Sequence, residues 1–211
     1  RKSKQGNYFN NLILTKKPIH IVWFKRDFRL MDNEALFHAH QSGVPLLFIC
    51  FFEPSVMSYP DSDVRHWRFI YESIQDLNKK FAPSNAKIYF FHNEVKTVFS
   101  KLIQEYEVKS VFSHQEIGNK LTYDRDLEMK AFFDSNDIIW NEFQMHGVIR
   151  KLKSRQDWDK RWEQVMRDTP KIIQESDLKT VELDPDFYNQ INGADLSTEI
   201  TTPNKNFQRG G

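Results

Sequence analysis

The chain has 211 residues, of which 39% are hydrophobic, and its formal net charge is only +1. This length suits one domain with an appendage, and so small a net charge argues against strong nonspecific binding to nucleic acid. The single cysteine, Cys50, excludes an internal disulfide and a cysteine-based metal site. No apolar run approaches the ~20 residues of a membrane span, so we expect a cytoplasmic protein without a membrane partner.

Short apolar segments predict five strands. In chain order they are residues 20–24, 44–52, 87–91, 110–113 and 138–143. Between them, apolar residues recur at helical spacing and predict helices. These helices are expected at about 32–41, 61–81, 95–106 and 123–135. Because strands alternate with helices, the sequence predicts an α/β fold: a doubly wound, Rossmann-like, five-stranded parallel sheet with helices on both faces.

Composition divides the chain into three parts. Residues 1–17 form a polar N-terminal tail, and residues 18–170 hold all the predicted strands. After about residue 170, Asp, Glu, Asn, Thr and Pro dominate without a sustained period. This composition predicts that residues 171–211 are a polar linker that lies over the surface.

The turn after the first strand carries the most specific motif. Residues 23–36 read WFKRDFRLMDNEAL. This segment resembles the opening signature of the photolyase/cryptochrome family, in which a strand ends in Trp-Phe and a basic-Arg-Asp-apolar-Arg-Leu turn follows. An Asp-Asn pair then starts the first helix and Ala-Leu continues it. Lys25 and Phe28 stand where the family more usually has Arg and Leu.

Three further segments carry the same resemblance. They are RHWRF at 65–69, SHQEIG at 113–118 leading to YDRD at 123–126, and FQRGG at 207–211. The last resembles the Gly-Gly step that opens the helical flavin domain of the family, so we expect a domain cut at its boundary. The spacing from Glu116 to Asp126 is a few residues longer than is usual, and GVIR at 147–150 with Trp158 resembles a bacterial branch.

The resemblance implies a blue-light flavoprotein, either a DNA photolyase or a cryptochrome. In this family a C-terminal helical domain carries FAD, and the α/β domain often holds an antenna chromophore. That antenna is a methenyl folate, a deazaflavin, FMN or a ribolumazine, and it passes excitation to FAD. The expected partners are the C-terminal FAD domain of the same protein and, through the full-length protein, DNA. The full-length protein resembles a deoxyribodipyrimidine photolyase, a lyase, whereas we expect no catalysis from this chain alone.

Ligands of doubly wound sheets bind beyond the carboxyl ends of the strands, where the first, second and fourth strands converge. Arg26 and Arg29 offer forked donors for a carboxylate or phosphate, Glu116 an acceptor for a pterin or flavin-like ring, and Phe52 an aromatic wall. The competing interpretation is an ion-paired loop that contacts no ligand, with Phe52 in the core. The candidate antenna-binding residues are Phe24, Lys25, Arg26, Asp27, Arg29, Phe52, Glu53, Gln115, Glu116 and Ile117.

Two hypotheses from other classes stay open: a free-standing nucleotide-binding module and an interaction scaffold without a light function. The absence of a glycine-rich phosphate loop counts against the first, and the histidines lack the spacing of zinc ligands. The basic run at 150–155, followed by Trp158 and Trp162, has two interpretations. It either contacts DNA phosphates in the full-length protein or forms a solvated helix that packs its tryptophan face.

Overall fold

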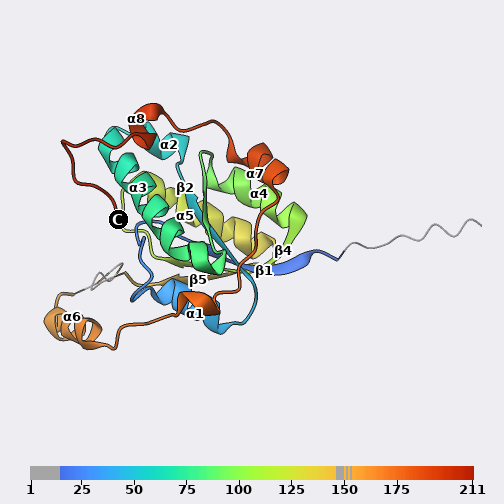
Figure 1. Cartoon of the computed structure of the whole chain (residues 1–211). Helices are drawn as coiled ribbons and strands as arrows, with labels where there is room; N and C mark the ends of the chain where they lie inside the picture. The colour runs from blue at the N-terminus through green and yellow to red at the C-terminus, as the bar shows by residue number, and fades with distance from the viewer. Residues whose placement is uncertain (1–14, 146–149, 151, 153) are drawn as a thin grey trace, which may run out of the picture.

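The computed structural model describes residues 15–145, 150, 152 and 154–211 (Figure 1). One five-stranded parallel sheet in the order β3-β2-β1-β4-β5 forms its centre. This arrangement confirms the predicted α/β fold, with the switch in strand order between β1 and β4. The strands are β1 (Lys17–Trp23), β2 (Leu46–Phe51), β3 (Ile88–Phe91), β4 (Tyr106–His114) and β5 (Ile139–Phe143).

Helices cover both faces of the sheet, as the sequence predicted. Side chains of β1 alternate between the two faces of the sheet, so Ile21 belongs to the hydrophobic core on one face and Val22 to the core on the other. The helices are α1 (Glu34–Gln41), α2 (Pro54–Met57), α3 (Val64–Phe81), α4 (Val95–Glu105), α5 (Lys120–Ser135), α6 (Trp158–Arg167), α7 (Pro185–Asn192) and α8 (Thr198–Thr201). No helix in the described part of the chain is long and apolar enough to span a membrane.

The boundary between α4 and β4 differs from the prediction. Tyr106 was expected to end a helix, because it continues the apolar stripe of α4. In the structure it is extended, with φ −117° and ψ 155°, and it begins β4. Tyr106 pairs with Lys17 of β1, so pairing in the sheet determines its conformation and overrides the local helical period.

The tail after residue 170 differs in part from the polar surface linker that we predicted. Two short helices, α7 and α8, lie within it, and four of its apolar side chains complete the two cores. These are Leu178, Leu183, Ile191 and Ile200, each at most 7% exposed. The role of this tail as a link to another domain stays a prediction.

Residues 197–211, which we call the C-terminal strap, lie against α3 (Figure 1). Nε and Nη2 of Arg68 both donate to the carbonyl oxygen of Glu199, at 2.9 and 2.6 Å. The backbone N–H of Gly210 donates to Glu72 at 2.8 Å. The approach is so close that a Cβ atom at Gly210 would lie 2.2 Å from the carbonyl oxygen of Phe69. Glycine is therefore required where the strap meets the helix.

Helix α6 stands at the edge of the molecule and has no buried residue. Trp158 and Trp162 share one face of it, as predicted, and their rings stack with centroids 6.4 Å apart. Both are more than two fifths exposed, so this face is not packed within the described part of the chain. Within the basic run, Arg150 turns inward to Glu142 and Glu116. The bacterial-branch motif falls largely on residues 147–149, which lie outside the described residues.

Candidate functional site

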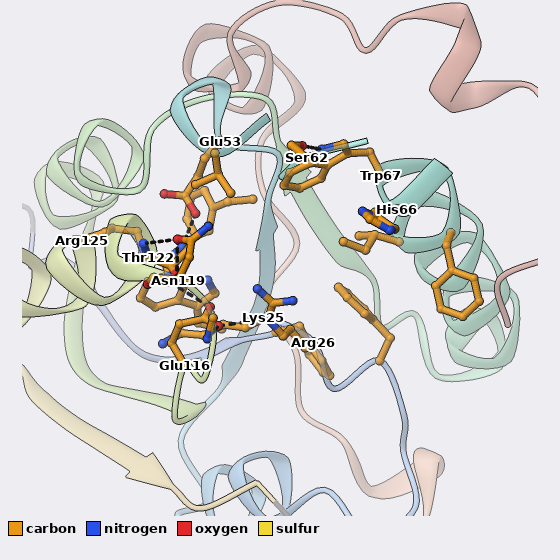
Figure 2. A pocket seen from close by; sticks show the side chains of 18 of the residues that line it. Lys25, Arg26, Glu53, Ser62, His66, Trp67, Glu116, Asn119, Thr122 and Arg125 are labelled. Atoms are coloured by element: carbon orange, nitrogen blue, oxygen red, sulfur yellow. Dashed lines mark hydrogen bonds and ion pairs between the residues drawn. The ribbon is translucent and has the colours of Figure 1, made fainter. Parts of the chain in front are cut away.

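A cavity of about 720 Å³ lies at the carboxyl ends of β1, β2 and β4, where the strand order switches (Figure 2). Sites of ligands in doubly wound sheets have this position, and this volume accommodates a molecule of cofactor size. The lining comes from the ends of three strands and from the first turns of α3 and α5. It consists of Trp23, Phe24, Lys25, Arg26, Phe28, Phe51, Glu53, Val56, Asp61, Ser62, His66, Trp67, Phe69, Ile70, Glu116, Gly118, Asn119, Thr122 and Arg125.

One wall of the cavity is aromatic and apolar. It is built by Trp67 and Ile70 of α3 together with Phe24 and Phe28 of the loop after β1, whose rings stack with centroids 6.1 Å apart. The indole N–H of Trp67 donates to the hydroxyl of Ser62 at 2.7 Å, which fixes the ring orientation. A planar ring inserted here would meet hydrocarbon and aromatic faces.

The opposite wall is organised around Glu116. Its Oε1 accepts hydrogen bonds from Nε of Arg26 at 3.0 Å and from the backbone N–H groups of Ile117 and Gly118, at 3.0 and 2.8 Å. Its Oε2 accepts from Arg125 at 3.3 Å. Burial would raise the pKa of Glu116, but the charges of Arg26, Arg125 and Lys25 outweigh it and hold the pKa below its usual value. The carboxylate of Glu116 is therefore ionised and already bound by two arginines and two backbone N–H groups.

Glu53 and Arg125 form a second, deeper ion pair on this wall. Glu53 directly precedes α2 and is 5% exposed. Burial raises the pKa of Glu53 to about 7, although the attraction of Arg125 lowers it. Arg125 also contacts Asp126, at 2.8 Å, and its carboxylate neighbours outweigh burial and raise its pKa. Arg125 is thus always charged, whereas Glu53 gains a proton near neutral pH.

Lys25 is enclosed beneath the cavity. Its ammonium group lies 2.9 Å from Asp126, and it faces the rings of Trp23 and Trp140 at 4.3 and 4.9 Å from their centroids. Burial lowers the pKa of Lys25 below its usual value, with Asp126 opposing this change. The two cation–π contacts and the ion pair hold this charge in place.

Arg26 is a polar lining residue that is open to a ligand. Its side chain is 53% exposed, and only its Nε is engaged, by Glu116. Figure 2 shows its guanidinium group between the Glu116 side of the cavity and the side formed by His66 and Trp67. Arg26 can therefore present its two terminal nitrogens to a bound molecule.

Five of the ten candidate residues line the cavity, namely Phe24, Lys25, Arg26, Glu53 and Glu116. Asp27 turns away from it into the interior, where its carboxylate lies 2.5 Å from Nδ1 of His114. Arg29 donates to the carbonyl oxygen of Asp32, and Phe52 lies in the core behind Trp67.

Gln115 and Ile117 also lie outside the lining. The backbone N–H of Gln115 continues the pairing of β4 with β5 through the carbonyl oxygen of Phe143, at 2.8 Å. Ile117 is 40% exposed. The loop after β4 therefore contributes to the wall chiefly through Glu116, and its neighbours serve the sheet or face solvent.

The candidate set omitted the lining residues of α3 and α5. His66, Trp67 and Phe69 belong to the RHWRF segment, and Arg125 belongs to the YDRD segment. The two segments lie in the first two turns of α3 and α5, the helices that come after β2 and β4 in the chain. The beginnings of such helices lie at the same sheet edge as the ends of the strands. This positional signal was present in the sequence and would have located them.

Comparisons with known proteins agree with this fold. Residues 20–172 match the family model described as DNA photolyase. Cryptochrome DASH, chloroplastic/mitochondrial, of Solanum lycopersicum is 26% identical over 106 residues, which cover 47% of this chain and 18% of the relative. The protein of the same name from Arabidopsis thaliana is 24% identical over 141 residues, covering 62% and 25%. The chain thus spans a quarter or less of these relatives' length.

Solved structures share the fold at lower identity. An archaeal photolyase from Sulfolobus tokodaii superposes with a TM-score of 0.68 at 16% identity, covering 92% of this chain and 44% of that one. A class III photolyase from Agrobacterium tumefaciens superposes with a TM-score of 0.63 at 17% identity, covering 82% and 37%. The family match extends over most of the chain and includes β1 to β5 almost entirely. The chain therefore belongs to the DNA photolyase family.

Proposed function

We propose that this chain positions an antenna chromophore for energy transfer to FAD. The FAD lies in a C-terminal helical domain of the same protein, which is a blue-light photolyase or cryptochrome and meets DNA through its full length. The observation that carries this proposal is the cavity of about 720 Å³ at the switch point of the sheet. One wall is aromatic and the other is charged, which suits a planar heteroaromatic molecule.

The construction of the cavity supports a positioning role. Energy transfer falls steeply with distance and depends on orientation, so an antenna must be held rigidly. Trp67 is fixed by Ser62, and Glu116 fixes both Arg26 and the loop after β4. Elements that are locked by packing and by hydrogen bonds place a ligand more reproducibly than free loops do.

A relative of the same fold supports a second chromophore. The Sulfolobus tokodaii photolyase was solved with two FAD molecules and is described as implying a novel light-harvesting cofactor. Methenyl folate, a deazaflavin, FMN and a ribolumazine are the candidates for this chain. The lyase activity, the FAD and any DNA contact belong to the whole protein in this proposal.

The direct experiment is to purify this chain and the longest available gene product, denature each, and identify every released chromophore by absorption and mass. We expect FAD and a second pigment from the long form, and the second pigment alone from this chain. A well-folded long form that releases no flavin would remove the light-driven function. FAD without a second pigment would keep the family but remove the antenna role.

A cavity-filling variant ties the second pigment to this site. Ile70→Trp places a large ring on the apolar wall and should reduce the bound second pigment by about tenfold or more. Ile139→Trp is the matched control, because Ile139 is 64% exposed on β5 and does not line the cavity. Equal pigment content in the two variants would place the chromophore elsewhere.

A further inference from the structure

We propose that Arg26 forms a phosphate-binding subsite in this cavity, so that the antenna is a ring compound with a phosphate ester. This inference rests on the proposed function, because it names the chemical class of the antenna. Among the four candidate antennas it favours FMN, which carries a phosphate ester, and the glutamate carboxylates of a methenyl folate are the competing oxyanions for the same guanidinium group.

The first support is the orientation of the Arg26 guanidinium group. Glu116 holds Nε at 3.0 Å, which fixes the plane of the group while leaving its end free. Within the described residues, Nη1 and Nη2 have no hydrogen-bond partner, and the side chain is 53% exposed. A planar fork held by a carboxylate at its base is organised in advance for an oxyanion at its tip.

The second support is that the other cations of the cavity are already engaged. Lys25 is 5% exposed and pairs with Asp126. Arg125 is 14% exposed and is divided between Glu53, Glu116 and Asp126. Among the lysine and arginine side chains on the described lining, Arg26 is therefore the one whose terminal donors are exposed to the cavity.

The carboxylates on the lining already have partners, so they would repel a phosphate bound at Arg26 less than unpaired carboxylates would. Glu116 and Glu53 are paired with arginines, and Asp61 accepts from the amide of Asn119 at 3.1 Å. His66 faces the same space from α3 (Figure 2) and can donate a further hydrogen bond. Donors from two sides suit a tetrahedral phosphate better than a planar ring edge.

Gly118 keeps this arrangement open. A Cβ atom at this position would lie 2.8 Å from Nη2 of Arg26 and 2.9 Å from Oε1 of Glu116. A side chain at residue 118 would therefore displace the ends of Arg26 and Glu116, whereas glycine lets the guanidinium group pack against the loop after β4. The loop after β4 and the side chain of Arg26 therefore pack directly against each other.

The test compares FMN with riboflavin, which share one ring system and differ by the phosphate. After removal of any copurified chromophore, dissociation constants are measured by titration calorimetry in phosphate-free buffer. We expect FMN to bind at least about tenfold more tightly than riboflavin. Arg26→Gln should remove the preference, so that FMN and riboflavin bind the variant with about the same affinity. Arg26→Lys, which keeps the charge without the fork, should be intermediate.

Arg29→Gln is the matched control. Arg29 lies in the same loop but donates to Asp32 and does not line the cavity, so its loss should preserve the preference for FMN. Circular dichroism checks that each variant is folded.

His66→Gln changes the subsite from the side of α3. It should reduce the preference for FMN over riboflavin in part.

The outcomes separate this inference from the proposed function. Equal affinity for FMN and riboflavin in the unaltered protein, or an FMN preference that survives Arg26→Gln, would overturn the subsite while leaving the antenna role intact. If neither flavin binds and no second pigment is released from the long form, the antenna role fails and the subsite fails with it. Added inorganic phosphate should weaken FMN binding and leave riboflavin binding unaffected; the opposite pattern contradicts the subsite.

Discussion

Glu53 carries a charge that depends on pH near neutrality, because it is buried beside the cavity. Its pKa rises from 4.5 to about 7, chiefly through burial. A carboxyl group whose pKa is raised on folding stabilises the folded state below its unfolded pKa, and this contribution is lost as the pH rises through the folded pKa. The relevant window therefore runs from about pH 4.5 to just above 7.

Glu53→Gln should remove this dependence. We expect the free energy of unfolding of the unaltered protein, relative to the variant, to fall by roughly 3 kcal/mol between pH 4.5 and 8, at about 1.4 kcal/mol for each pH unit between the two pKa values. Urea denaturation across this range measures the difference. Glu107→Gln, at an exposed surface position on β4, is the control. A constant difference across the range would contradict the assignment.

Side-chain direction was the part of the site that the sequence could not supply. The motif located the loop after β1, and Lys25 and Arg26 of that loop line the cavity. Asp27 lies next to them in the chain but turns inward to His114, 87 residues away. Burial would raise the pKa of Asp27, but hydrogen bonding and attraction from His114 hold it below its usual value. Such a partnership follows from the packed fold and leaves no local pattern.

At the scale of elements, the spacing of apolar residues predicted the strands and the main helices. It did not predict that side chains after residue 170 pack against them. Continuous apolar runs marked β1 and β2, which are covered on both faces. The four buried apolar residues after residue 170 are isolated among polar neighbours, so they form no period. These side chains are buried because they fill grooves formed by α3, α4 and the sheet. A short stretch of sequence around each of them does not show that such a groove exists.

The strap and α3 should respond as one element. Gly210→Ala would bring a Cβ atom against the carbonyl oxygen of Phe69, and we expect a loss of about 1–3 kcal/mol of stability. Amide hydrogen exchange should accelerate in α3, including the turn that carries Trp67 and Ile70. Arg209→Ala, at an exposed neighbouring position, is the control and should leave exchange unchanged. Unaltered protection of α3 in the Gly210 variant would show that the strap does not hold the helix.

At the scale of the whole molecule, the match to the family model and the folded unit have different limits. The match ends at residue 172, yet Leu178, Leu183, Ile191 and Ile200 complete both cores. Burying one such side chain contributes about 1.5–3 kcal/mol, so the four together approach the 5–15 kcal/mol that stabilises a typical domain. The stability of the folded sheet should therefore depend on the residues after 172.

A chain shortened to residues 1–172 tests this dependence. We expect it to lose cooperative unfolding in urea and to aggregate, because two grooves of the core would be open to water. The intact chain, prepared identically, is the reference. A shortened chain that unfolds at the same urea concentration as the intact one would show that the tail is dispensable.

The shared core of sheet and tail also limits how this gene can recombine. A crossover placed at residue 172 would join one parent's grooves to another parent's Leu178 and Ile200, and the side chains would no longer match in shape. Recombinants should therefore work when the sheet and the tail come from the same parent, for example with the crossover at the end of the tail, beyond the contact of Gly210 with α3. Over evolutionary time, residues 173–210 should vary in concert with the sheet.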